Sequence, residues 1–175
     1  MAVGAGGLAA AEPADGPMAA NVSARDMPLL PSPLAGEDAA VFPVQGFTGF
    51  GESAARFGAW RGGRRHEGQD IFAPTGSPLF AMRDGKVVET GDDGGRGNYI
   101  AVFNPEHDET YLYLHMKNPA RARPGDWVRA GAGVGAVGCT GSCFGDHLHL
   151  ELRRGRGTLG KPVDPLPLLR RLLPR

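Results

Sequence analysis

Short apolar runs separated by turn-forming residues make up most of the chain from Phe42 onward. The runs include SPLFAM, GKVVETG, NYIAVF, TYLYLHM and HLHLEL, and glycine, proline or aspartate stands between them. Runs of this length and spacing are typical of short antiparallel strands rather than helices. The pattern therefore predicts an all-β domain over residues 42–175, built on a compact antiparallel β-sheet core of sandwich or barrel-like form.

The two ends of the chain depart from this pattern. Residues 1–41 show no hydrophobic period and few large apolar side chains, which predicts a disordered tail, a linker or the remnant of a secretion signal. The closing segment DPLPLLRRLLPR predicts one short amphipathic helix packed against the sheet. Within the domain, Asp84-Gly85 favours a two-residue type I′ hairpin turn, and GDDGGRGN predicts a longer loop.

Composition narrows the class of protein. The chain has 175 residues, enough for one domain with a real core, and its 28 glycines and 15 prolines support many turns. The formal net charge of zero provides no overall field for nucleic acid or an anionic membrane. No uncharged apolar run reaches the roughly 18 residues of a membrane-spanning helix. We therefore expect no nucleic-acid partner, no transmembrane segment, and a monomer.

The segment DHLHLEL contains two of the five histidines. Alternate side chains of a strand share a face, so His147, His149 and Glu151 point one way and the leucines between them point the other. Two imidazoles and a carboxylate on one face suit metal binding or proton transfer. Glu151 either accepts a hydrogen bond from a ligand histidine or forms a surface salt bridge.

The upstream segment RRHEGQDI supplies a possible counterpart, with His66 and Asp70 four residues apart. In an extended strand their α-carbons would lie roughly 13 Å apart, too far for both to bind one ion at about 2 Å. A bend is therefore required, and Gly68 can provide it. With His149 these residues form a set of three, and three protein ligands plus a water are usual for catalytic zinc.

A third segment, YLYLHM, predicts a strand with Tyr111, Tyr113 and His115 facing a cleft, and with the two leucines and Met116 behind them. If this strand lies near the histidine strand, His115 and His147 could flank the metal without binding it. One would accept a proton and the other would stabilise a developing oxyanion.

Taken in order, these motifs resemble those of the lysostaphin-type zinc endopeptidases, which cleave peptidoglycan cross-links. HEGQD, YLYLH and HLHLEL are separated by APTGSPLFAMRDGKV and RPGDWVRAGAGVGAVGCTG, and the resemblance runs from about Phe42 to Pro165. It implies a duplicated hybrid motif fold with the site in a groove. It also implies one zinc ion per chain, three ligands and two non-ligand catalytic histidines: His66, Asp70 and His149 as ligands, His115 and His147 as catalytic residues.

The resemblance implies a zinc metalloendopeptidase that acts on the peptide part of peptidoglycan, in a secreted or cell-envelope location. Asn98 matches an asparagine of the family and is interpreted as a substrate contact, and Tyr113 as a packing residue that also contacts substrate. The arginines at 61, 64 and 65 either meet substrate carboxylates or form a solvated charged run. The alternative function is a non-catalytic peptidoglycan-binding or hydrolase-activating module on the same fold.

The two cysteines, Cys139 and Cys143, depart from the family pattern. They could close a small disulfide ring if the turn at Gly141 brings their α-carbons within about 7 Å, which would suit an oxidising compartment. The alternative is a structural zinc site that combines them with His147 and His149. That alternative leaves HEGQD and YLYLH without a role.

Overall fold

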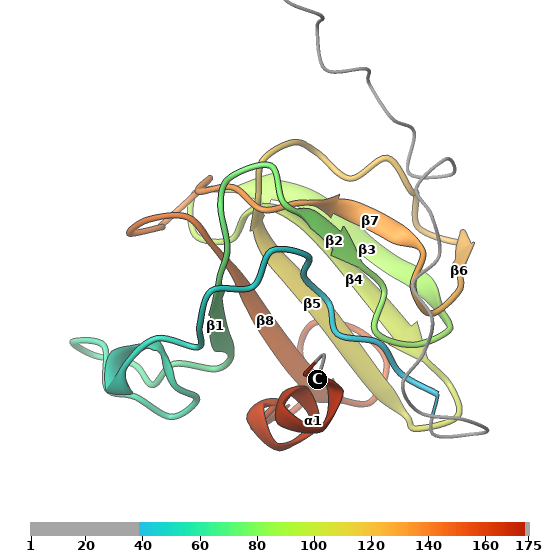
Figure 1. Cartoon of the computed structure of the whole chain (residues 1–175). Helices are drawn as coiled ribbons and strands as arrows, with labels where there is room; N and C mark the ends of the chain where they lie inside the picture. Colours follow the sequence, from blue (N-terminus) through green and yellow to red (C-terminus); the bar gives the residue numbers. More distant parts are fainter. Residues whose placement is uncertain (1–38, 174–175) are drawn as a thin grey trace, which may run out of the picture.

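The structure, a computed structural model, describes residues 39–173 (Figure 1). Strands dominate, and a single α-helix stands at the C-terminal end of the described part, as the sequence pattern predicts. In chain order the elements are the 3₁₀ helix η2 (Ser53–Ala55), β1 (Gln69–Phe72), β2 (Pro78–Phe80), β3 (Gly85–Asp93), β4 (Gly97–Asn104), β5 (Glu109–Met116), β6 (Trp127–Val128), β7 (Gly133–Ala136), β8 (His147–Arg154), β9 (Pro162–Val163) and α1 (Leu166–Leu172).

Two antiparallel sheets enclose the main core. The larger sheet has the order β1-β8-β5-β4-β3-β6, with β9 beside β8, and the smaller sheet pairs β2 with β7. Figure 1 shows the small sheet lying across one face of the large one. Large buried side chains from both sheets, such as Leu79, Val134, Ile100 and Leu148, belong to one cluster. The predicted sandwich-like β core is therefore confirmed.

The helix predicted near the C-terminal end packs as expected, whereas the described end of the predicted tail is part of the core. Leu168, Leu169 and Leu172 of α1 are buried in the main core, so the predicted amphipathic helix is confirmed. Most of the predicted tail, residues 1–41, lies outside the described residues. Of its last three residues, Ala40 and Val41 are buried, and the Val41 N–H donates a hydrogen bond to the carbonyl of residue 82. No helix in the described range is long and apolar enough to span a membrane.

The hairpin predicted at Asp84-Gly85 is absent from the structure. β2 pairs with β7, whereas β3 begins at Gly85 and pairs with β4 and β6. The prediction was wrong because Gly85 is required for space, not for a turn: a Cβ there would lie 2.6 Å from the carbonyl oxygen of Phe103. The predicted long loop GDDGGRGN is mostly strand, with a turn over residues 94–96.

The faces of β8 follow the predicted alternation. Its leucines lie in the main core, and its two histidines and Glu151 therefore occupy the opposite face. The same alternation fails for β5, whose eight residues are all buried. Tyr113 pairs with Leu150 and lies in the core, whereas Leu114 pairs with His149. The predicted facing of the tyrosines toward a cleft was therefore wrong.

A bulge near the end of β5 returns His115 to the site face. Asn98 pairs with Met116 and Ile100 pairs with Tyr113, so two steps along β4 match three along β5. At this irregularity His115 has a φ of 61°, which is uncommon for a residue other than glycine. The extra residue sends Met116 into the core and leaves His115 beside the histidines of β8.

The position of Tyr113 yields a stability prediction. Its buried hydroxyl accepts a hydrogen bond of 2.8 Å from the Met82 N–H, and Tyr113→Phe would leave that N–H buried without a partner. We expect the variant to lose about 1–3 kcal/mol of unfolding free energy, measured by denaturant titration. Tyr99→Phe is the control and should cost less, because its partner Glu89 is 37% exposed and can bind water instead. Equal stability of wild type and Tyr113→Phe would contradict this assignment.

Candidate metal centre and active site

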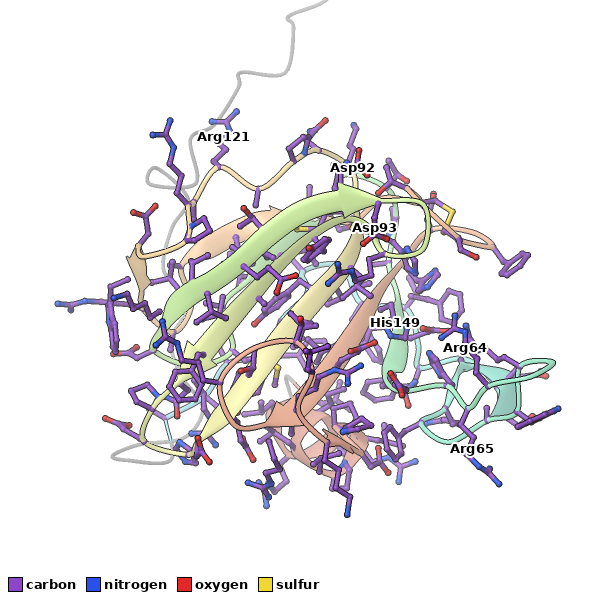
Figure 2. All side chains as sticks on the ribbon, turned by 180° about the vertical axis from the view of Figure 1, so that it is seen from behind. Arg64, Arg65, Asp92, Asp93, Arg121 and His149 are labelled. Atoms are coloured by element: carbon purple, nitrogen blue, oxygen red, sulfur yellow. A yellow bond between two sulfur atoms is a disulfide. The ribbon has the colours of Figure 1, made fainter. Side chains whose placement is uncertain are left out.

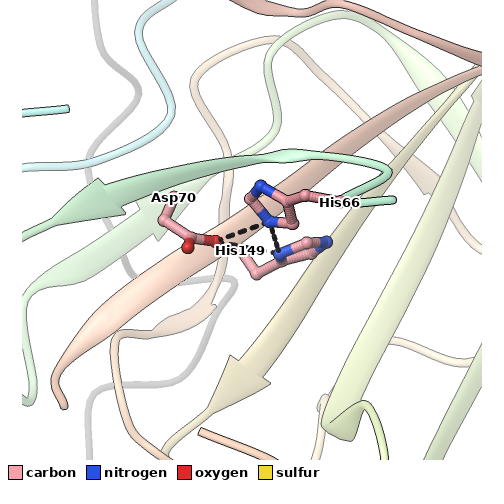
Figure 3. Close-up of side chains that lie close together, drawn as sticks. All are labelled: His66, Asp70 and His149. Carbon is pink, nitrogen blue, oxygen red and sulfur yellow. Dashed lines mark hydrogen bonds and ion pairs between the residues drawn. The ribbon is translucent and has the colours of Figure 1, made fainter. Parts of the chain in front are cut away.

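The structure brings together the three residues that the sequence predicts as metal ligands (Figure 3). The ladder between β1 and β8 sets Asp70 opposite His149, and His66 comes from the segment just before β1. Asp70 Oδ1 lies 3.1 Å from His66 Nε2 and 2.9 Å from His149 Nδ1. The two histidine nitrogens are 2.9 Å apart. All three side chains are buried.

Gly68 occupies the bend between His66 and Asp70, where the sequence requires one. Its φ is not positive, so the position does not need glycine for its backbone conformation. Space is the reason: an added Cβ would lie 2.5 Å from the carbonyl oxygen of Leu150 and 2.7 Å from His149 Nε2. The segment can therefore pass closely enough over β8 to place His66 against His149.

The hydrogen bonds of the two histidines determine which nitrogens face each other. His66 Nδ1 lies 2.8 Å from the carbonyl oxygen of Arg56, and His149 Nε2 lies 3.2 Å from Glu151 Oε1, so each of these nitrogens carries the proton and donates it. With those protons in place, His66 Nε2 and His149 Nδ1 present lone pairs next to the Asp70 carboxylate. Three such donors repel one another unless a cation lies between them, and two imidazoles plus a carboxylate are ordinary zinc ligands. The donor set therefore fits a divalent ion such as zinc.

Arg61 holds the second oxygen of the ligand carboxylate. Its Nη2 lies 2.5 Å from Asp70 Oδ2 and also donates to the carbonyl of Ala54 at 2.9 Å. From the sequence, this arginine is predicted either to belong to a solvated charged run or to contact substrate carboxylates. Its pairing with Asp70 is visible only in the fold.

Arg64 and Arg65 extend from the same loop, which leads into β1 on the side of the molecule where His149 lies (Figure 2). Both are exposed, and Arg65 donates a hydrogen bond of 2.9 Å to the carbonyl of Gly58. The three arginines therefore differ in role. Arg61 binds the ligand cluster, and the other two remain on the surface.

Glu151 accepts a hydrogen bond from His149, as one of its two predicted roles requires, and its salt bridge is buried rather than on the surface. One carboxylate oxygen accepts from His149, and the other accepts from Arg153 Nε at 2.7 Å. Arg153 also pairs with Glu67 at 2.6 Å. A carboxylate that accepts the distal N–H of a ligand histidine fixes the orientation of that ring. Here the salt bridge in turn fixes the carboxylate.

His115 and His147 stand beside the ligand cluster, with ring centroids 5.2 Å apart. Each donates its Nδ1–H to a loop carbonyl, His115 to Thr140 at 2.8 Å and His147 to Gly145 at 2.7 Å. His147 Nε2 is buried, has no hydrogen-bond partner in the described part of the chain, and lies 3.5 Å from Asp70 Oδ1. Burial lowers the pKa of His147. Burial also lowers the pKa of His115 to about 4, although the hydrogen bond to Thr140 acts in the opposite direction. Both rings are therefore neutral at pH 7 and can accept protons.

The two residues predicted to contact substrate occupy different surroundings. Tyr113 is fully buried on the core face of β5, so the structure does not bring it to the site. Asn98 lies at the start of β4, and its Nδ2 donates to the carbonyls of Met116 at 3.2 Å and Lys117 at 3.5 Å. It supports the end of β5, next to His115. A substrate contact by Asn98 remains a prediction.

Cys139 and Cys143 form a disulfide, with their α-carbons 5.3 Å apart. A bridged pair has no thiolate to offer a metal. The alternative of a structural zinc site formed with His147 and His149 is therefore wrong.

Comparison with known proteins identifies the family. Residues 64–165 match the model of Peptidase family M23. The chain belongs to peptidase family M23. The matched segment of this M23 chain contains all five clustered residues: His66, Asp70, His115, His147 and His149.

Three M23 relatives illustrate the similarity. The chain is 38% identical over 103 residues to the peptidoglycan DD-endopeptidase ShyA of Vibrio cholerae. The aligned region covers 58% of this chain and 22% of ShyA. The catalytic domain of the antimicrobial peptidase lysostaphin from Staphylococcus simulans has a TM-score of 0.60 and 30% identity, over 69% of this chain and 90% of that one. A zinc-containing peptidase from Vibrio cholerae has a TM-score of 0.55 and 26% identity, over 71% of this chain and 39% of that peptidase. This M23 chain thus spans about a fifth of the length of curated relatives such as ShyA.

The bond between Arg61 and Asp70 yields a prediction about metal affinity. In Arg61→Ala the carboxylate loses the partner that fixes Oδ2, so we expect zinc affinity to fall about 10- to 100-fold. Competition with a chromophoric chelator measures this. Arg64→Ala removes the same charge from an exposed position three residues away and should leave zinc affinity unchanged. A similar loss in both variants would mean that general electrostatics, not this contact, sets the affinity.

Proposed function

We propose that this M23 domain is a zinc metalloendopeptidase that hydrolyses peptide bonds in peptidoglycan cross-links, with one zinc ion per chain held by His66, Asp70 and His149. The observation that carries the proposal is the convergence of three buried ligand atoms, all within 3.1 Å of one another, beside two neutral histidines. The names of relatives support the finer points, since ShyA is a peptidoglycan endopeptidase and a structural neighbour contains zinc.

Zinc in such a site supplies Lewis acidity, which polarises a scissile carbonyl and makes water a better nucleophile. The protein's own groups then handle protons. His147 is the proposed proton acceptor, because its Nε2 has no hydrogen-bond partner within residues 39–173 and lies beside the ligand cluster. Overall, the C–N bond of the substrate breaks, the water oxygen joins the carbonyl carbon, and a proton passes through the imidazole to the leaving nitrogen.

His115 is the proposed second catalytic residue. Its Nδ1–H is committed to the Thr140 carbonyl, so only its Nε2 is left to act on substrate. A proton that this nitrogen takes up during the reaction would give an N–H that stabilises the negative charge developing on the carbonyl oxygen. Asn98 is proposed to contact substrate through its amide oxygen, because its amide nitrogen already binds the end of β5. A peptidoglycan substrate places the working protein in a secreted or cell-envelope location.

The separation of ligands from proton-handling residues can be tested by metal analysis. We expect Asp70→Ala and His149→Ala to lose stoichiometric zinc, because each removes one of three protein ligands. His115→Ala should retain one zinc per chain and lose about 10²- to 10⁴-fold in kcat. Inductively coupled plasma measurements on purified proteins decide the first point, and a peptide-release assay decides the second. Unchanged zinc in all three variants would defeat the ligand assignment.

The reaction itself can be tested on purified peptidoglycan. We expect the zinc-loaded protein to release new amino groups, which a chelator should stop and added zinc restore. His149→Ala is the matched control. Mass spectrometry of defined muropeptide digests then identifies the bond that is cut. Full zinc loading without any release would favour the alternative of a non-catalytic binding or activating module.

A further inference from the structure

One loop carries the acceptors that orient both non-ligand histidines. Gly138 forms an isolated bridge with His147, and residues 139–146 form the loop between them. Within this loop the carbonyl of Thr140 accepts from His115, and that of Gly145 accepts from His147. Since these bonds determine which ring nitrogen is protonated and where the other points, the loop backbone sets the geometry of both rings.

The disulfide closes this loop around the two acceptors. Thr140 lies inside the ring between Cys139 and Cys143, and Gly145 follows two residues later. The Gly145 N–H donates to Cys139 Sγ at 3.3 Å, and Cys143 Sγ lies 3.8 Å from His147 Nδ1. The disulfide sulfurs therefore lie against Gly145, whose carbonyl accepts from His147, and against the imidazole of His147.

The other side of the disulfide-closed loop packs against the large sheet. Thr140 Oγ1 donates to the Met116 carbonyl at 2.8 Å and accepts from the Asn98 N–H at 2.9 Å. Gly97 and Gly141 pack so closely that a Cβ on Gly141 would lie 2.3 Å from the Gly97 nitrogen. The disulfide-closed loop thus packs against the β5 bulge, the point at which His115 turns toward the site.

The three metal ligands do not depend on this loop. The distal nitrogen of His66 is held by the carbonyl of Arg56, that of His149 by Glu151, and the second oxygen of Asp70 by Arg61. Opening the disulfide would therefore free the acceptors of the catalytic histidines and leave the ligand cluster intact.

We propose that the Cys139–Cys143 disulfide is a positioning element for His115 and His147, a role that rests on the proposed peptidase function. Opening the bridge should lower turnover and leave metal binding and substrate affinity largely unchanged. A phosphine can open it: the S–S bond breaks, each sulfur gains an electron and a proton, and phosphorus is oxidised to the phosphine oxide with oxygen from water. Three glycines lie at 138, 141 and 145, so the opened loop would have little stiffness of its own.

The test uses the zinc-loaded protein before and after treatment with a water-soluble phosphine, with bridge opening verified by alkylation and mass spectrometry. We expect kcat to fall about 10- to 100-fold while KM changes little and zinc stays at one per chain. The double variant Cys139→Ser/Cys143→Ser should show the same loss and no response to phosphine. Reoxidation of the treated wild type should restore its activity.

Nuclear magnetic resonance gives a readout that does not need turnover. The Nδ1–H signals of His115 and His147 should broaden or vanish when the bridge opens, whereas the N–H signals of His66 and His149 should persist. Unchanged kcat with the bridge open would overturn the proposal, and so would loss of zinc together with activity. If the oxidised, zinc-loaded protein has no activity at all, the peptidase function fails instead, and the histidine signals still decide whether the disulfide positions the rings.

Discussion

The antiparallel pairing of β1 with β8 is the constraint on which the site depends. It sets Asp70 opposite His149, and in the next pair it sets Ile71 opposite Leu148, both fully buried in the core. A slip by one residue would send every side chain of one strand to the opposite face. Burial of the apolar pair thus prevents the slip that would separate the proposed metal ligands. Core packing and ligand geometry have the same origin.

Four buried histidines cluster here, and each has one N–H committed to a fixed acceptor. Burying an imidazole without a hydrogen bond is costly, so these bonds offset part of the desolvation. Three of the acceptors are main-chain carbonyls in loops and one is a strand carboxylate: Arg56, Thr140, Gly145 and Glu151. Sheet register therefore places the strand histidines, while the acceptors set ring orientation and tautomer. Change in the loops can alter the chemistry without altering the fold.

The sequence predicts those parts of the site in which polar and apolar residues alternate or in which spacing demands a bend. It predicts the faces of β8 and the bend at Gly68 for this reason. It fails on β5, because all eight residues are buried and a tyrosine can enter the core when its hydroxyl finds a backbone partner, as Tyr113 does. The bulge that returns His115 to the site has no residue-type signal, since the positive φ falls on a histidine. Nor can a run of arginines reveal that Arg61 alone reaches a carboxylate.

The site divides into two halves that the fold supports separately. The proposed ligand half is held by the segment before β1 and by Glu151, whereas the proposed proton-handling half is held by the disulfide-closed loop and the end of β5. The two halves therefore take their hydrogen-bond acceptors from different parts of the chain. Here both halves are complete and face each other across 3.5 Å, from His147 Nε2 to Asp70 Oδ1. A buried imidazole nitrogen that lies beside a carboxylate and has no hydrogen-bond partner among the described residues is unusual in a purely structural role, which supports the proposed catalysis.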